Sequence, residues 1–248
     1  MNDHVKRDNR RALPKYLLTI LLYGLLGGVL GFFTGVAGAA GVAETVRQAL
    51  DRLLAVCAPW GIVVSAVVLL GTGWYLYAAA KRRFAAWDGD DEDAVDAAER
   101  QLSWALLLTG LMVVLDFFFF AASIIYERFL PDVVLFLASV AVLVVLQQKI
   151  VDLERRINPE KRGSVYDMKF QKTWMESCDE AERAQIGQAS YRAFRFTSLF
   201  CLFLWLALLI LSFVFHIGLL PMAAVLLVWA VLQVSYILEC IRIGKPRA

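Results

Sequence analysis

The sequence contains few of the residues, and none of the motifs, with which catalytic and metal sites are usually built. Its two histidines, His4 and His216, are far apart, and its four cysteines form no CxxC pair, so we predict neither a zinc site nor a disulfide framework. No HExxH, GxSxG or GxxxxGK(S/T) motif is present. We therefore expect no enzyme, no catalytic residue, no metal and no cofactor. One enzymatic alternative is acid–base chemistry on a lipid by Asp116 and Glu239, whose sequence positions give no convergent geometry.

An excess of charge of one sign is also lacking. The chain has 25 Lys and Arg residues and 23 Asp and Glu residues, which leaves a formal net charge of +2. No block of basic residues interleaved with aromatics predicts a nucleic-acid groove, and the stretch Asp88–Glu99 is net acidic. We therefore expect no nucleic-acid partner.

Apolar residues are abundant and make up 60% of the chain. They gather in six stretches, most of which reach the ~20 residues that a helix needs to cross ~30 Å of hydrocarbon. The sequence therefore predicts an all-α membrane protein, a single six-helix bundle over residues 1–248 that is embedded in the lipid bilayer. The predicted spans are approximately 16–40, 60–80, 104–126, 133–148, 197–215 and 219–238, and the larger loops are 81–103 and 149–196.

Positive charge gathers in every second gap between the apolar stretches. Of the 25 Lys and Arg residues, only Arg47, Arg52 and Arg128 lie in the other gaps. By the positive-inside rule, both chain ends and the two larger loops are predicted to be cytoplasmic. The first stretch follows a basic start and ends at small residues, as a secretory signal peptide does. Its apolar run is longer than that of a signal peptide, so we expect a membrane anchor.

Glycine is concentrated in the first stretch at helical spacing. Gly27, Gly31 and Gly35 recur every fourth residue, and Gly24 and Gly28 form a parallel pair. A helix face without side chains lets another backbone approach closely, which matters because lipid provides no hydrophobic drive for helix association. We predict a tight helix contact here, either within one chain or as the seam of a homodimer.

A short amphipathic segment follows the first stretch. Apolar residues of Glu44–Cys57 recur at helical spacing, while charged residues occupy the rest of the helix circumference. The segment predicts a helix that lies on the outer membrane interface and is ended by Pro59. It either covers the outer ends of the spans or acts as a gate or partner-binding element.

Asp116 is the only charged residue deep within a predicted span, and four phenylalanines follow it directly. An ionised carboxylate at this depth costs several kcal/mol, so the side chain is expected to face the bundle interior and to find a polar partner or stay protonated. Ser139 and Ser212 lie at matching depth in other spans. Asp116 is therefore either a proton, cation or substrate site, or a hydrogen-bonded contact between helices.

The loop 149–196 contains the most distinctive soluble sequence. A proline and a glycine near its middle set turns, and a capping box at Ser177 and Glu180 predicts the start of a helix that leads into the fifth span. Between them, aromatic residues recur at every fourth position and predict one face of a helix: Tyr166, Phe170 and Trp174. This face belongs either to a small cytoplasmic cap under the bundle or to a docking surface for another protein.

The same loop carries the run NPEKRGSVYDMKFQKTWMESCDEAE at residues 158–182. With this run, the chain resembles the bacterial Domain of Unknown Function 3169 family. The specific match covers residues 158–189, and the six-span arrangement extends it loosely over the rest of the chain. The resemblance implies a multi-pass protein of the bacterial cytoplasmic membrane, and it transfers no catalytic residue.

We therefore expect a non-enzymatic accessory or permease-like membrane component that docks a protein partner through the loop 149–196. The alternative is a small secondary transporter or channel that uses Asp116 as an intramembrane ion or proton site. A lone acid, little polar lining and no evident discontinuous helix outside the first span weigh against this alternative.

Overall fold

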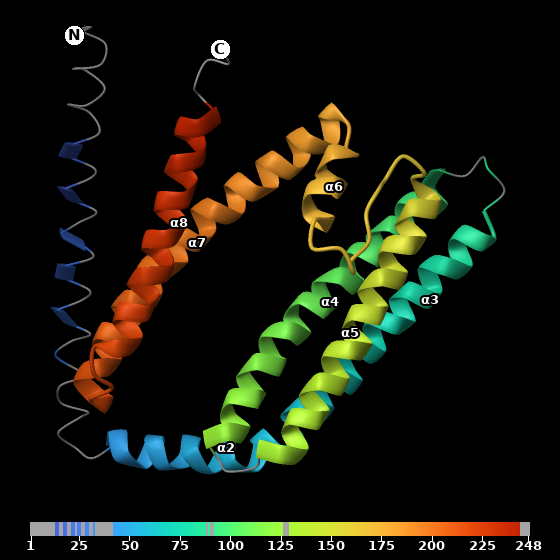
Figure 1. The fold of residues 1–248 in the computed structure, drawn as a ribbon. Helices are drawn as coiled ribbons and strands as arrows, with labels where there is room; N and C mark the ends of the chain where they lie inside the picture. The colour runs from blue at the N-terminus through green and yellow to red at the C-terminus, as the bar shows by residue number, and fades with distance from the viewer. Residues whose placement is uncertain are drawn as a thin grey trace, which may run out of the picture. The chain divides into compact units, whose positions relative to one another are not determined.

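The computed structural model describes residues 42–87, 89, 92–125 and 129–243, together with isolated positions of the predicted first span, namely 13, 14, 17, 18, 21, 22, 24, 25, 28, 29 and 32. The regular structure of the continuous ranges is entirely helical (Figure 1), which confirms the all-α prediction for them. The elements in chain order are α2 (Val42–Ser65), the π-helical turn η1 (Ala66–Leu70), α3 (Gly71–Ala85), α4 (Glu92–Ile125), α5 (Phe129–Ile157), α6 (Phe170–Glu176), α7 (Glu180–Phe215) and α8 (Leu220–Ile243).

Five stretches of helix within the described residues are long and apolar enough to cross a membrane. They match the predicted second to sixth spans and cover Trp60–Ala85, Glu92–Ile125, Pro131–Ile157, Glu180–Ser212 and Leu220–Ile243. Most of the predicted first span, 16–40, lies outside the described residues. The first span, and with it the total of six, and the orientation in the membrane therefore stay predictions.

Three helices extend beyond the predicted spans into polar sequence. α4 begins at Glu92, before the predicted third span, and α5 continues to Ile157, beyond the predicted end of the fourth span near 148. α7 begins at Glu180, which agrees with the helix predicted to lead from Ser177 and Glu180 into the fifth span. An apolar run marks only the part of a helix that can lie in hydrocarbon, whereas main-chain hydrogen bonding continues for as long as the residues favour it.

The prediction that Pro59 ends the amphipathic helix is wrong. α2 runs from Val42 through Pro59 to Ser65, and η1 follows it directly. Proline within a helix removes one main-chain hydrogen bond and favours a bend, which membrane helices tolerate where other groups satisfy the backbone. The amphipathic segment and the start of the second span are therefore one helix.

The internal contacts divide the chain into two compact units. Unit 1 comprises residues 1–49 and 188–248, and unit 2 comprises residues 50–187. Unit 2 contains most of α2, η1, α3 to α6 and the first turns of α7. The single domain expected over residues 1–248 stays a prediction.

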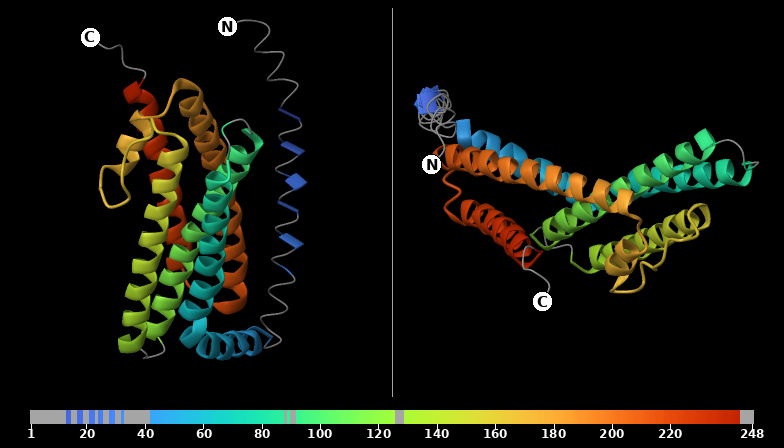
Figure 2. Two further views of the ribbon diagram at one scale, coloured as in Figure 1. Left: turned by 90° about the vertical axis from the view of Figure 1, so that its right-hand side faces the viewer. Right: turned by 90° about the horizontal axis from the view of Figure 1, so that it is seen from above.

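In unit 2, the helices α3, α4 and α5 run side by side and alternate in direction (Figure 1 and Figure 2). Ala80, Ala98 and Ala105 lie between them with no exposed surface. Such small residues let the helix backbones approach closely. The close approach strengthens dispersion contacts between the helices, which matter because lipid provides no hydrophobic drive for helix association. The whole core cluster of this bundle consists of Leu70, Ala80, Ala98, Leu102, Ala105, Met112, Leu143, Leu146, Ile150 and Leu153.

In unit 1, the helices α7 and α8 pair in opposite directions (Figure 2). The side-chain amide of Gln233 donates to Ser198 Oγ at 3.3 Å, and the rings of Phe194 and Tyr236 stack with their centroids 4.2 Å apart. An amide–hydroxyl contact of this kind links two membrane helices without placing a charge between them.

The glycine ridge of the first span is only partly described. A Cβ added to Gly24 or Gly28 would meet no atom within 4 Å, so the described residues provide no close neighbour at these two positions. Gly27, Gly31 and Gly35 lie outside the described residues. Tight packing of this ridge, within one chain or in a homodimer, therefore stays a prediction.

Two other glycines, both in unit 2, do face a neighbouring helix. A Cβ on Gly61 would overlap the Phe119 ring, and one on Gly73 would lie 3.1 Å from Cδ2 of Leu146. The sequence pattern missed both because neither belongs to a repeated glycine spacing. Close approach of helices is thus achieved in unit 2 by isolated glycines and alanines.

We expect Gly61→Ala to lower the melting temperature of the protein in detergent. The new methyl group must displace the Phe119 ring, and overpacking of this kind costs about 1–3 kcal/mol, more than the gain of up to about 1 kcal/mol in helix propensity. Gly110→Ala is the matched control, since a Cβ on Gly110 meets nothing within 4 Å. If Gly61→Ala melted at or above the temperature of Gly110→Ala, the contact with Phe119 would be wrong.

Candidate functional site

The candidate site lies at the polar end of the unit 2 bundle, beside the extensions of α4 and α5. Residues 158–169, which we call the strap, turn back from the end of α5 and run along the bundle to α6 (Figure 1). Gln148, within α5, holds the strap in place. Its Oε1 accepts hydrogen bonds from Ser164 Oγ at 2.9 Å and from the Val165 amide at 2.8 Å. Because Gln148 is itself buried, this anchor is shielded from water.

The turns that the sequence predicted in the strap are present. The amide of Lys161 donates to the carbonyl of Asn158 at 3.1 Å and closes a turn over Pro159. Gly163 has a φ of 122°, and a Cβ there would lie 2.9 Å from the ring of Phe170. A glycine is required at this position because residues with a side chain rarely adopt this φ, and because the Phe170 ring leaves no room for a Cβ.

The helix start predicted near Ser177 is present, but a different pair of residues caps it. The amide of Glu182 donates to Asp179 Oδ1 at 2.7 Å, and the amide of Asp179 donates to Glu182 Oε2 at 3.0 Å. This reciprocal pair is a capping box with an aspartate as its first member. Ser177 instead accepts a hydrogen bond from the Arg162 amide at 3.1 Å and donates to the Trp174 carbonyl at 2.7 Å. Both serine and aspartate can cap a helix, so spacing alone could not choose between them.

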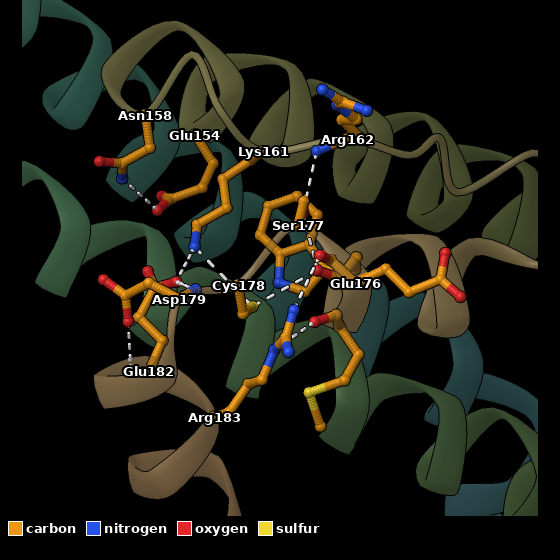
Figure 3. A network of polar contacts seen from close by, with 12 residues as sticks. Glu154, Asn158, Lys161, Arg162, Glu176, Ser177, Cys178, Asp179, Glu182 and Arg183 are labelled. Carbon is orange, nitrogen blue, oxygen red and sulfur yellow. Dashed lines mark hydrogen bonds and ion pairs between the residues drawn. The ribbon is translucent and has the colours of Figure 1, made fainter.

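Lys161 ties the strap to the start of α7. Its side chain is 4% exposed, and its ammonium forms an ion pair with Glu182 and lies 3.8 Å from Cys178 Sγ (Figure 3). Arg183 completes the connection, because its guanidinium donates to the last carbonyls of α6, at 3.2 Å to Met175 and 2.9 Å to Glu176. The strap, α6 and the first turn of α7 therefore form one connected polar network.

The pKa of Lys161 reflects this surrounding. Burial opposes the charged form, but the hydrogen bond to Glu182 and the neighbouring Cys178 and Glu160 outweigh it and raise the pKa above its usual 10.5. A lysine whose pKa is higher in the folded chain than in the unfolded chain stabilises the fold. This contribution is complete at pH values below the unfolded-state pKa and is lost only as the pH rises through the folded-state pKa. The ion pair therefore persists throughout the neutral pH range.

The three aromatic residues predicted to share a helix face are divided between two surroundings. α6 begins at Phe170, so Tyr166 precedes the helix and lies on the strap, where it is 66% exposed. Phe170 and Trp174 are half-buried, and their ring centroids are 5.6 Å apart. The fourth-residue spacing is interrupted because Gly163 and the turn that follows it redirect the chain before the helix starts.

Beneath α6 lies a cavity of about 510 Å³. Its wall contains two carboxylates, three uncharged polar side chains, two aromatic rings and five aliphatic side chains, and no lysine, arginine or histidine. The lining residues are Glu99, Leu102, Ser103, Leu106, Gln147, Ile150, Val151, Glu154, Val165, Phe170, Gln171 and Trp174.

Two acidic side chains meet at the wall of this cavity. The side-chain amide of Asn158 donates to Glu99 Oε1 at 2.8 Å and to Glu154 Oε1 at 3.1 Å. The two acceptor oxygens are therefore no more than about 6 Å apart, at which like charges repel by roughly 3 kcal/mol for an effective dielectric constant of about 20, before screening by water. One amide donor shared by two carboxylates offsets only part of this repulsion.

Sequence reasoning did not single out Glu99, Glu154 or Asn158. Glu154 continues the helical phase of the buried residues Ile150 and Val151 beyond the apolar stretch. Extending the buried face of the fourth span by one turn would have placed Glu154 toward the bundle. The proximity of Glu99, on another helix, had no signal in the sequence.

Asp116 lies in α4 away from this cavity and has no exposed surface. Ser139 Oγ donates to Asp116 Oδ2 at 2.7 Å. Ser139 is one of the two serines predicted to lie at the depth of Asp116. The other, Ser212, belongs to unit 1. The second oxygen, Oδ1, is buried and has no hydrogen-bond partner among the described residues. The geometry is that of a hydrogen-bonded helix contact, and neither Asp116 nor Ser139 lines the cavity beneath α6.

Among the described residues, no group of three or more His, Cys, Asp or Glu side chains is placed to hold a metal ion. The polar end of unit 2 instead combines a fixed strap, an exposed aromatic residue and a partly acidic cavity. The run of sequence that builds the strap, α6 and the capped start of α7 is the same run that resembles a known family.

Comparison with known families extends that resemblance to nearly the whole chain. The family described as protein of unknown function (DUF3169) matches residues 10–240. The chain belongs to the DUF3169 family. No curated protein and no solved structure matches it.

We expect Ser139→Ala to destabilise the DUF3169 chain in detergent. The substitution removes the only hydrogen bond found for the Asp116 carboxyl in the described residues, and leaving a buried polar group unpaired costs about 1–3 kcal/mol. Asp116→Asn should melt close to the wild type, because an amide oxygen still accepts from Ser139. Ser235→Ala is the control, since Ser235 is exposed and bonds only to carbonyls of its own helix. Equal melting of all four proteins would contradict a structural role for this contact.

We expect Lys161→Ala to expose the thiol of Cys178. In the wild type this thiol is 5% exposed, and losing a charged hydrogen bond of about 1.5–3 kcal/mol should speed its reaction with a maleimide by roughly tenfold or more. Lys172→Ala is the matched control, because the ion pair of Lys172 with Glu176 is exposed and contributes little. Identical labelling rates in both variants would show that Lys161 does not hold the strap and α6 closed.

Proposed function

We propose that this DUF3169 protein is a non-enzymatic, multi-pass component of the bacterial cytoplasmic membrane that docks a partner protein through its strap. The observation that carries this proposal is the exposure of two large apolar side chains on a fixed segment. Met168 is 102% exposed and Tyr166 is 66% exposed. Large apolar groups that protrude from a rigid, polar surrounding are typical anchors of protein interfaces.

The strap presents these side chains in an organised conformation. Besides the anchor at Gln148, Asp167 Oδ1 accepts from the Lys169 amide at 2.9 Å, and the carbonyl of Asp167 accepts from the Phe170 amide at 2.9 Å. Binding to a segment that is already ordered avoids most of the entropy cost of fixing a loop. This supports recognition by the strap as it stands.

An exposed lysine beside the two anchors favours a partner with an acidic group at its rim. Lys169 directly follows Met168 and is exposed, whereas the exposed Lys172 is already paired with Glu176. Cations around an apolar anchor steer the approach of a negatively charged partner and add selectivity. Phe170 and Trp174, which the sequence placed in the same docking surface, are half-buried and line the cavity beneath α6.

The second candidate function, an ion or proton site at Asp116, rests on the unpaired Oδ1 atom of that residue. Transport would need a polar path to this atom. The cavity beneath α6 has a lining that includes Leu102 and Leu106 on α4 and does not include Asp116. We therefore rank the docking function above transport.

The proposal places the strap on the cytoplasmic side. This orientation follows from the distribution of basic residues and is tested by the thiol of Cys178 in the Lys161→Ala variant. A membrane-impermeant maleimide should label it only after the cells are permeabilised. Labelling in sealed cells would put the strap outside and overturn the cytoplasmic docking surface.

We expect a benzophenone amino acid at Tyr166 to cross-link a discrete protein in living bacteria. The same label at Glu160, which is exposed on the strap but lies away from the two anchors, is the matched control and should give no such product. Adding Met168→Asp should reduce the Tyr166 product by about tenfold, since an apolar anchor contributes about 1–3 kcal/mol or more. Equal products from both positions, or lipid adducts alone, would contradict protein docking at the strap.

A further inference from the structure

The cavity beneath α6 has a chemical character that docking at the strap does not explain. Its volume of about 510 Å³ lies in the range of about 300–1,000 Å³ that is typical of small-molecule sites. Two half-buried carboxylates, Glu99 and Glu154, face it together with the rings of Phe170 and Trp174.

The two carboxylates lack a counter-ion of their own within the lining. The one buried lysine nearby, Lys161, is already paired with Glu182. The hydrogen bond that the described structure provides to each carboxylate comes from the same uncharged amide, Asn158. A cation placed in the cavity between Glu99 and Glu154 would therefore be attracted by both and would relieve their mutual repulsion.

The rest of the wall selects the kind of cation. Leu102, Ile150 and Val151 are aliphatic and buried, so a small hydrated metal ion would leave most of the cavity surface without a partner. Trp174 and Phe170 place aromatic rings in the lining, and the face of such a ring attracts organic cations through its quadrupole. The combination fits a molecule with one positive charge and a substantial apolar portion.

We propose that this cavity binds an amphiphile through a single ammonium group, with that group between Glu99 and Glu154 and its apolar portion against Trp174, Phe170 and the aliphatic wall. Leu106, which is 43% exposed, and Ser103 lie at the margin of the cavity on α4, where the apolar stretch of that helix begins. This margin lets an amphiphile enter from the membrane interface. The ligand is therefore either a free amphiphilic amine or the amine headgroup of a lipid.

The test begins with the wild-type protein in a neutral maltoside detergent. A dimethylaminostyryl-pyridinium dye supplies an apolar monocation whose fluorescence rises in apolar surroundings, and the neutral styrylpyridine of the same shape is its control. We expect the cationic dye to bind at least about tenfold more tightly, because two carboxylates attract only the charged form. Equal affinity for the two dyes overturns the proposal, and this comparison requires no mutation.

Variants then locate the binding. Glu99→Gln and Glu154→Gln each keep an oxygen that accepts from Asn158, and each should weaken binding of the cationic dye by roughly tenfold while leaving the neutral dye unchanged. Asp96→Asn is the matched control, since Asp96 is exposed on α4 and lies outside the cavity lining. If Asp96→Asn weakened dye binding as much as Glu99→Gln did, the effect would come from overall charge, and the site would be wrong.

Competition distinguishes the two sources of the cation. A short-chain phosphatidylethanolamine that displaces the dye identifies a lipid headgroup as the ligand, whereas displacement by an alkylamine alone identifies a free amphiphilic amine. Either result supports the site, and failure of both competitors overturns it. The measurement uses purified protein without a partner, so its outcome is independent of docking at the strap.

Discussion

The polar contacts between α4 and α5 are the constraint on which the rest of unit 2 depends. Apolar helices in lipid gain nothing from hydrophobic burial against each other, so small residues bring them close and hydrogen bonds fix their register. Asp116 meets Ser139, Thr109 accepts from Gln147 at 3.1 Å, and Asn158 reaches Glu99. As the residue number falls along α4 from 116 to 109 to 99, the partner's number rises from 139 to 147 to 158, as expected for two antiparallel helices. A shift of either helix by one turn would break all of them and would leave the Asp116 carboxyl buried without a partner.

This register determines what happens at the polar end. With α5 fixed against α4, Glu154 lies beside Glu99, and Gln148 is turned toward the strap, where it holds Ser164 and Val165. Gly163 completes this arrangement, because its φ of 122° and the nearby Phe170 ring leave no room for a side chain at the turn. The same arrangement that aligns two helices long and apolar enough to cross a membrane thus builds the floor of a cavity and the base of the strap.

α6 belongs to both proposed activities. Its residues Phe170 and Trp174 form part of the cavity wall, while the strap that precedes it exposes Tyr166 and Met168 to solvent. Lys161 and Arg183 hold the two ends of this region against α7. Because one short helix separates the cavity from the exposed anchors, any partner that moves α6 would change the shape of the cavity, and the two binding events would then be coupled reciprocally.

The sequence by itself determined the helical class, the position of five long apolar helices and the isolation of Asp116, because these follow from local composition and from the cost of placing polar groups in hydrocarbon. Its periodicity also located the strap turns and a helix start near Ser177. It could not decide that Pro59 lies within α2, that Asp179 is the cap, or that Tyr166 stands apart from Phe170 and Trp174. Each of these depends on competing local conformations that only packing resolves. The meeting of Glu99 with Glu154 was decided by tertiary structure alone, since it joins residues of different helices through a register that no single helix contains.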